Sequence, residues 1–179
     1  MLNSINEDDI EELVEILSNA KKIEFWGQGA SAVVAQDAYH KFFRAGISCA
    51  TTSDPHMQCM SAGVMSKGDV VVAISHTGKS ENLITNAKIA KAQGGIVIGI
   101  TMNSSPLAKI CTHTVGINVD EDTDIYLPML SRLAHLMVID ILAVGVMLKK
   151  GKQAMDRMRR MKEALMQIKY SSVDEESEE

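Results

Sequence analysis

The sequence predicts an α/β protein, a three-layer αβα sandwich whose five-stranded parallel sheet has the flavodoxin-like strand order 2-1-3-4-5. Two observations predict this class. Short apolar runs alternate along the chain with segments of helical period, which favours parallel strands joined by right-handed crossovers. Runs such as VVVAI (70–74) are apolar at every position, which indicates that helices cover both faces of the sheet.

The predicted elements follow from local periodicity. Apolar residues at helical spacing between positions 10 and 17 predict an opening helix. The predicted strands are 23–26, 47–50, 69–75, 96–101 and, with a weaker pattern, 113–118. The predicted helices between them are 31–46, 54–65, 80–95 and a short piece at 105–110. Asp54 before Pro55 is a good candidate for a helix cap.

Two further helices with apolar stripes are predicted at the end of the chain, over about 128–149 and after Gly151. We expect the first to be buried, because its longest apolar run is too short for a bilayer and carries Asp140. Its stripe consists of Leu130, Leu133, Ala134, Met137, Ile141 and Leu148. The second stripe, expected to be core or dimer contact rather than a metal site, consists of Met155, Met158, Met161, Leu165 and Ile168. Together with the opening helix, these helices exceed what one sheet needs to cover its faces, so we expect a homodimer or tetramer that uses one of the three.

The composition fits one domain of 179 residues and excludes a broad basic surface for nucleic acid. The net charge is −5, but SSVDEESEE (171–179) contains five acids and no base. Without these five, 18 of the 23 acids remain against 18 bases. We therefore expect a folded domain over 1–170 and a disordered acidic tail over 171–179. The basic run at 149–162 is interpreted as a solvated face or, alternatively, as a contact with phosphates near DNA.

The start of the chain and its cysteines bear on where the protein is located. Its start, MLNSINEDDIEELVEIL (1–17), is acidic and amphipathic, unlike a signal peptide. The cysteines are odd in number and lack CxxC spacing, which is typical of buried, reduced thiols: Cys49, Cys59 and Cys111. We therefore expect a cytoplasmic protein with no membrane contact.

The first candidate binding loop is WGQGAS (26–31), which follows the first strand. Gly27 and Gly29 let backbone amides approach a ligand, and Ser31 stands at a helix start. The spacing also fits a loose dinucleotide fingerprint, but the second strand lacks the acid that holds a ribose before Asp54. The alternative to a binding loop is that the two glycines only allow a tight turn between the strand and the helix.

The second loop, SHTGKS (75–80), follows the third strand. A nucleotide P-loop is excluded, because the position five residues before Gly78 is Ala73 and not glycine. In sheet order 2-1-3 the two loops face one crevice. Hydroxyl groups could then surround a phosphate together with loop amides and a helix N-terminus: Ser31, Ser75, Thr77 and Ser80. His76 and Lys79 either contact the ligand or face water.

Other polar residues are weaker candidates. Arg132 and His135 lie one turn apart on the long helix, where they could reach a second acid group of a ligand. Burial or a subunit contact is the alternative for both. No cluster of His, Cys, Asp and Glu has metal-ligand spacing, so neither a metal nor a cofactor is predicted.

The two loops together resemble the SIS (sugar isomerase) family, whose members bind phosphosugars through such turns. The resemblance covers about residues 1–150. The segments at 25–47, 74–84 and 131–148 are similar to the effector domain of RpiR-type bacterial transcription regulators. That resemblance implies a phosphosugar effector, such as the sugar-acid phosphate 2-keto-3-deoxy-6-phosphogluconate. It also implies a dimer that contacts DNA only through an N-terminal helix-turn-helix domain, which we expect to be absent from this chain.

An aldose–ketose phosphate isomerase on the same fold is the second hypothesis. Isomerisation needs a base beside the carbonyl carbon. The candidates are Glu81, His40, His56, His76 and His135. No base with an evident orienting partner is visible, which favours a sensor over an enzyme. A purely structural oligomerisation module is a third hypothesis, and it leaves the two polar loops unexplained.

Overall fold

The computed structural model describes residues 6–119, 121 and 128–175, and it confirms the predicted sheet. Its strands are all parallel and lie in the order β2-β1-β3-β4-β5. They are β1 (Lys22–Gly27), β2 (Cys49–Thr52), β3 (Asp69–Ile74), β4 (Ile96–Thr101) and β5 (His113–Gly116). The pairing of β1 with β3 places Gly27 beside Ile74, so both strands end at the same edge of the sheet.

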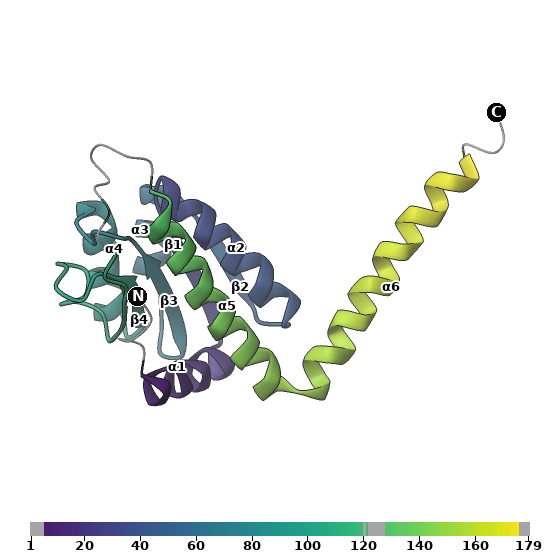
Figure 1. Cartoon of the computed structure of the whole chain (residues 1–179), viewed down its shortest axis with the longest axis horizontal. Coiled ribbons are helices and arrows are strands. Elements are labelled where there is room, and N and C mark those ends of the chain that lie inside the picture. Colours follow the sequence, from purple (N-terminus) through teal and green to yellow (C-terminus); the bar gives the residue numbers. More distant parts are fainter. Residues whose placement is uncertain (1–5, 120, 122–127, 176–179) are drawn as a thin grey trace.

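Helices cover both faces of this sheet, as expected (Figure 1). They are α1 (Glu7–Asn19), α2 (Ala30–Arg44), α3 (Pro55–Gly63), α4 (Glu81–Ala92), α5 (Leu130–Lys150) and α6 (Lys152–Glu175). Alternate side chains of a strand point to opposite faces. Phe25 accordingly packs in the core beneath α1, α2 and α5, whereas Trp26 packs in the core beneath α3 and α4. The three-layer architecture is therefore confirmed.

Helix α3 begins as the sequence predicts. The Asp54 carboxylate accepts a hydrogen bond from the backbone N–H of Met57 at 2.9 Å, and Pro55 occupies the first turn. This cap satisfies a donor that the helix itself leaves unpaired.

A buried carboxylate lies inside β1. Glu24 is 4% exposed, and Lys22, Trp26 and Ser61 surround it. Lys22 Nζ and Ser61 Oγ donate to one carboxylate oxygen, and Trp26 Nε1 donates to the other at 2.8 Å. Burial raises the pKa of Glu24, but these hydrogen bonds outweigh it and hold the pKa below its ordinary value. We call these four residues the Glu24 cluster.

The prediction of a short helix at 105–110 is wrong, because this segment forms turns. The backbone N–H of Leu107 donates to the carbonyl of Gly78 at 3.1 Å instead of to its own segment. Ser105 Oγ accepts from the N–H of Ala108 at 3.0 Å. The segment is therefore held against the loop that follows β3.

Helix α5 is buried on a different side from the predicted stripe. Of the six stripe residues only Ala134 is buried, and Leu148, for example, is 76% exposed. The buried face consists of Ser131, Ala134, His135, Val138, Ile139, Leu142, Ala143 and Val146. By length and composition α5 could cross a membrane, but nearly half of it is buried in this fold. Its Asp140 pairs with Lys41 of α2.

Helix α6 projects from the body of the domain (Figure 1). Among its described side chains only Ala154 is buried, and Leu165 and Ile168 are exposed. Of the two expectations for this stripe, core or dimer contact, the core is excluded within one chain, and the dimer contact stays a prediction. The helix continues through Glu175, past the predicted domain end at 170, and residues 176–179 of the expected tail lie outside the described residues.

All three cysteines are free. Cys49 and Cys111 are half-buried, and burial raises the pKa of each thiol to about 11, which keeps them protonated. Cys59 is exposed, so the expectation of burial is wrong for this residue.

Candidate functional site

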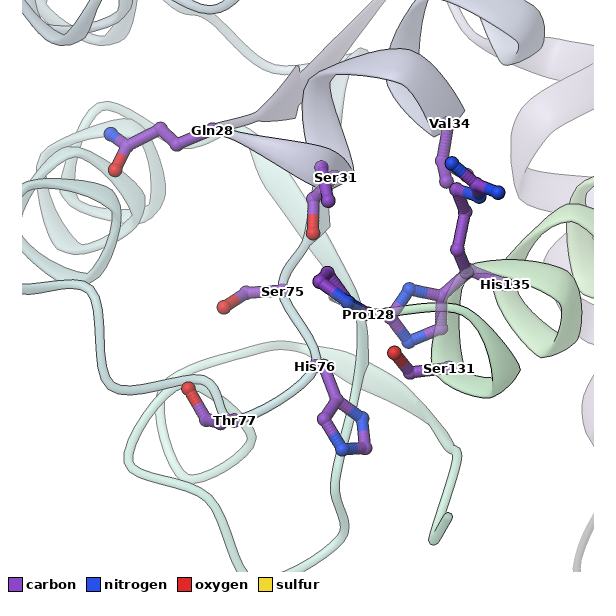
Figure 2. A pocket seen from close by; sticks show the side chains of 11 residues that line it. Gln28, Ser31, Val34, Ser75, His76, Thr77, Pro128, Ser131 and His135 are labelled. Atoms are coloured by element: carbon purple, nitrogen blue, oxygen red, sulfur yellow. The ribbon is translucent and has the colours of Figure 1, made fainter. Parts of the chain in front are cut away.

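The loops after β1 and β3 meet the first turns of α5 around a small cleft of about 170 Å³. Figure 2 shows Ser31, Ser75 and Thr77 along one side of it and Ser131 and His135 of α5 along the other. The residues that line the cleft are Gln28, Ala30, Ser31, Val34, Ser75, His76, Thr77, Pro128, Ser131, Arg132 and His135. The cleft therefore lies at the sheet edge where ligands of such folds collect.

The structure brings together six of the residues that the sequence singled out. They are Ser31, Ser75, His76, Thr77, Arg132 and His135. The remaining candidates do not line the cleft: Gly27, Gly29, Gly78, Ser80 and Glu81. Glu81 is exposed at the start of α4, and Ser80 immediately precedes that helix.

The glycines shape the loops. A Cβ at Gly27 would lie 2.4 Å from the carbonyl oxygen of Ser31, so only glycine allows α2 to start this close to β1. Gly78 has a φ of 59°, and a Cβ there would lie 2.5 Å from Ser105 Oγ. Both positions therefore require glycine for backbone reasons.

The loop after β3 is held rigidly. The N–H of Gly78 donates to Ser75 Oγ at 3.2 Å, and the carbonyl of His76 accepts from the N–H of Met102 at 3.1 Å. No described residue accepts a hydrogen bond from the backbone N–H of Thr77, Lys79 or Ser80. Helix α4 starts here without a side-chain cap. These free donors and the helix N-terminus favour an anion.

Two buried histidines face each other across the cleft. His76 is 8% and His135 is 1% exposed, and their ring centroids are 6.1 Å apart. Burial lowers the pKa of His76. Burial, together with the nearby His76, lowers the pKa of His135 to about 4. Both rings are therefore neutral near pH 7 and can each donate and accept one hydrogen bond.

Unpaired polar atoms concentrate at this cleft. In the described part of the chain, five buried side-chain atoms have no hydrogen-bond partner, and three of them belong to cleft residues. These three are Nε2 of Gln28, Nδ1 of His76 and Nε2 of His135. A wider hollow of about 800 Å³ beside β2 is lined by none of the five. Buried polar atoms are normally paired, so the smaller cleft is the better ligand site.

Glu121 occupies the N-terminus of α5. Its carboxylate accepts from the backbone N–H groups of Met129, Leu130 and Ser131 at 2.7, 2.9 and 3.1 Å, and from Ser131 Oγ. The hydrogen bonds from Ser131 and these amides lower the pKa of Glu121 to about 2. An anionic ligand therefore finds α5 already capped by a carboxylate, whereas the N-terminus of α4 is open.

Sequence reasoning missed Gln28, Ser131, Pro128 and Glu121. Gln28 lies between the two glycines of the first loop, and Ser131 lies one turn before His135, so a signal for each was present. Glu121 is eight residues from the first amide that it caps, and no local pattern indicates that contact.

Comparison with known families agrees with this architecture. The family profile of the SIS domain matches residues 16–145, and the chain belongs to the SIS domain family.

Among individual relatives, the chain is similar to the HTH-type transcriptional regulator HexR of Escherichia coli K12. The two are 45% identical over 168 residues, which is 94% of this chain and 58% of HexR. HexR of Pseudomonas aeruginosa is 44% identical over 161 residues, and 56% of it is covered. The chain thus spans little more than half the length of these relatives.

Solved structures extend the comparison. NanR of Vibrio vulnificus, complexed with ManNAc-6P, superposes with a TM-score of 0.85 and 25% identity over 92% of this chain and 62% of that one.

Proposed function

We propose that this chain is the phosphosugar-sensing effector domain of a transcription regulator of carbohydrate metabolism. The observation that carries the proposal is the cleft, which is lined by the hydroxyls of Ser31, Ser75 and Thr77 and by two buried histidines that each keep a ring nitrogen unpaired, and which lies beside the free amides of the loop before α4. The similarity to HexR and to NanR, which was solved with a sugar phosphate, supports it.

The phosphate is proposed to bind at the loop before α4. Ser75 and Thr77 line the cleft there, and Ser80 adds a hydroxyl beside the helix N-terminus. Amides of this loop supply further donors. Ser31 reaches the body of the ligand from the neighbouring loop.

The ligand is proposed to be a sugar-acid phosphate such as 2-keto-3-deoxy-6-phosphogluconate. Neutral imidazoles suit a hydroxyl-rich body, because each ring can both donate and accept. Arg132 is exposed at the rim of the cleft, where it can pair with the acid group of the sugar. The small volume of the cleft suits a ligand of this size.

Calorimetric titration with this compound and with several hexose phosphates tests the proposal. A hydroxyl bond to a charged group contributes roughly 1.5–3 kcal/mol, so Ser31→Ala and Ser75→Ala should each weaken binding about tenfold or more. Ser53→Ala, at an exposed serine outside the cleft, is the matched control and should bind like the wild type. The proposal fails if no phosphosugar binds the wild type or if both cleft variants bind as well as it does.

An isomerase is the second candidate, because the cleft contains histidines that could act as a base. Three features favour the sensor. Glu81 lies outside the cleft. The carboxylate of Glu121 is already bonded to the backbone at the start of α5. His76 Nδ1 and His135 Nε2 have no hydrogen-bond partner that would orient the ring as a base. Sugar phosphates incubated with the protein in the same experiment should therefore be recovered unchanged.

The proposed partners follow from this role. We infer a homodimer or tetramer in the cytoplasm, without membrane contact. DNA binding is assigned to an N-terminal helix-turn-helix domain of a longer protein, as the name of HexR indicates for that relative.

A further inference from the structure

Helix α5 presents an apolar face that nothing in the described part of the chain covers. Its most exposed large side chains are Leu130, Leu133, Met137, Ile141, Val144 and Leu148, between 37% and 76% exposed. We call them the α5 stripe. The opposite face of α5 carries Ser131 and His135 into the cleft, so one rigid element joins the cleft to this stripe.

Helix α6 presents a second apolar face. Its 24 residues extend about 36 Å, and Figure 1 shows it leading away from the sheet. Four apolar residues follow the 3-4-3 spacing of a and d positions in a coiled coil: Met158, Met161, Leu165 and Ile168. We call them the α6 seam. A helix with so few contacts to its own domain depends on packing against another surface.

A groove of about 430 Å³ lies at the base of this seam. Met158, Met161 and Leu165 line it from α6, and Phe43 lines it from α2. Phe43 is 50% exposed, so the groove can accept apolar side chains from another molecule.

The charges of α1 and α6 indicate that this other molecule is a second copy of the chain. Helix α1 carries six exposed acids and no base. It lies beside α5, because Val14 contacts Gly145 and Lys149 pairs with Glu15. The first half of α6 is basic, with Lys152, Arg159, Arg160 and Lys162 exposed, whereas Arg157 donates to the carbonyl of Gly46 in its own chain. Among the described residues no ion pair joins α1 to α6, so this complementarity is not used within one chain.

We propose that two copies of this chain associate by exchanging α6. The α6 seam of each copy packs on the α5 stripe of the other, and the basic residues of α6 face the acidic α1 of the other copy. Each copy gives and receives the same contact, as a two-fold symmetric dimer requires. This inference deepens the homodimer proposed above and does not depend on which ligand the cleft binds.

Complementary charge reversal tests the exchange. One variant is Arg159→Glu/Arg160→Glu in α6, and the other is Asp8→Lys/Glu11→Lys in α1. Sedimentation equilibrium without ligand should show a wild-type dimer at micromolar concentration, whereas each variant alone should dissociate about a hundredfold more readily, because like charges then meet. An equimolar mixture of the two variants should recover the dimer, since both α6–α1 contacts are then attractive.

The double variant Lys88→Glu/Lys109→Glu reverses two exposed charges away from α1, α5 and α6, and it should remain dimeric. Circular dichroism checks that every variant is folded. A monomeric wild type overturns the proposal. So does a pair of variants that both stay dimeric, or a mixture that stays monomeric. Loss of phosphosugar binding with an intact, charge-dependent dimer would count against the cleft and not against the exchange.

Discussion

The Glu24 cluster and the cleft both place polar side chains in the interior, but their hydrogen bonds differ. Each carboxylate oxygen of Glu24 accepts from at least one donor. In the cleft, by contrast, His76 and His135 each keep one ring nitrogen unpaired. Glu24 lies in the middle of β1, whereas the histidines lie beyond the ends of the strands.

This difference separates a structural role from a binding role. A buried polar group that is fully paired stabilises one arrangement of its neighbours, and loss of its partner is costly. A buried polar group without a partner costs stability unless something outside the chain completes it. The cleft is therefore where we propose that a ligand stabilises the fold.

The largest expected effect is on the Glu24 cluster. Glu24→Ala should lower the free energy of unfolding by about 3 kcal/mol, because the N–H of Trp26 and the hydroxyl of Ser61 each lose their acceptor, at about 1–3 kcal/mol apiece, whereas Lys22 can turn to water. Urea unfolding measures the loss. Glu11→Ala, at an exposed acid of α1, should stay within about 0.5 kcal/mol of the wild type. A loss below about 1 kcal/mol for Glu24→Ala would contradict the structural role.

The next effect is a pH dependence that originates in the cleft. The pKa of His135 is about 4 in the folded chain and near 6.5 when unfolded, so the unfolded chain binds more protons between these values. Stability should therefore fall as the pH falls, by about 2 kcal/mol between pH 7 and pH 5 from His135 alone.

Urea unfolding at several pH values measures this slope. His135→Asn should flatten it, while His76, whose pKa is also lowered, keeps a smaller part of the same sign. The measurements cover pH 7 to pH 5 only. Glu24 and Glu121 have lowered pKa values and remain ionised throughout this range, so they do not contribute to the slope. An equal slope in His135→Asn and wild type would show that His135 is not held neutral by burial.

The smallest expected change in stability, that of His135→Leu, distinguishes a binding role from a structural role most directly. His135→Leu removes an imidazole whose Nε2 has no partner, so the free energy of unfolding at pH 7 should change by less than about 1 kcal/mol. Affinity for the phosphosugar should nevertheless fall about tenfold. Parallel urea unfolding and calorimetry separate the two. Unchanged affinity would remove His135 from the binding site.

Much of the fold and part of the site follow from local patterns in the sequence. The strand order follows from alternating elements, and Ser31 and Ser75 follow from turns placed after the first and third strands. The orientation of α5 could not be predicted, because this helix is apolar on every side and periodicity cannot then choose a face. The turns at 105–110 depend on the carbonyl of Gly78, and the cap by Glu121 depends on a contact across eight residues. Both are tertiary contacts without a local signal.

The parallel pairing of β1 with β3 determines how late the cleft can form during synthesis of the protein. Parallel neighbours cannot be joined by a tight hairpin, so the walls of the cleft are distant in the chain, from Gln28 to His135. As the polypeptide leaves the ribosome, Ser31 emerges first, Ser75 joins it only after two crossovers, and α5 arrives last. The proposed ligand site is therefore completed only when α5 has emerged, and a fragment that stops before α5 lacks one wall of the cleft.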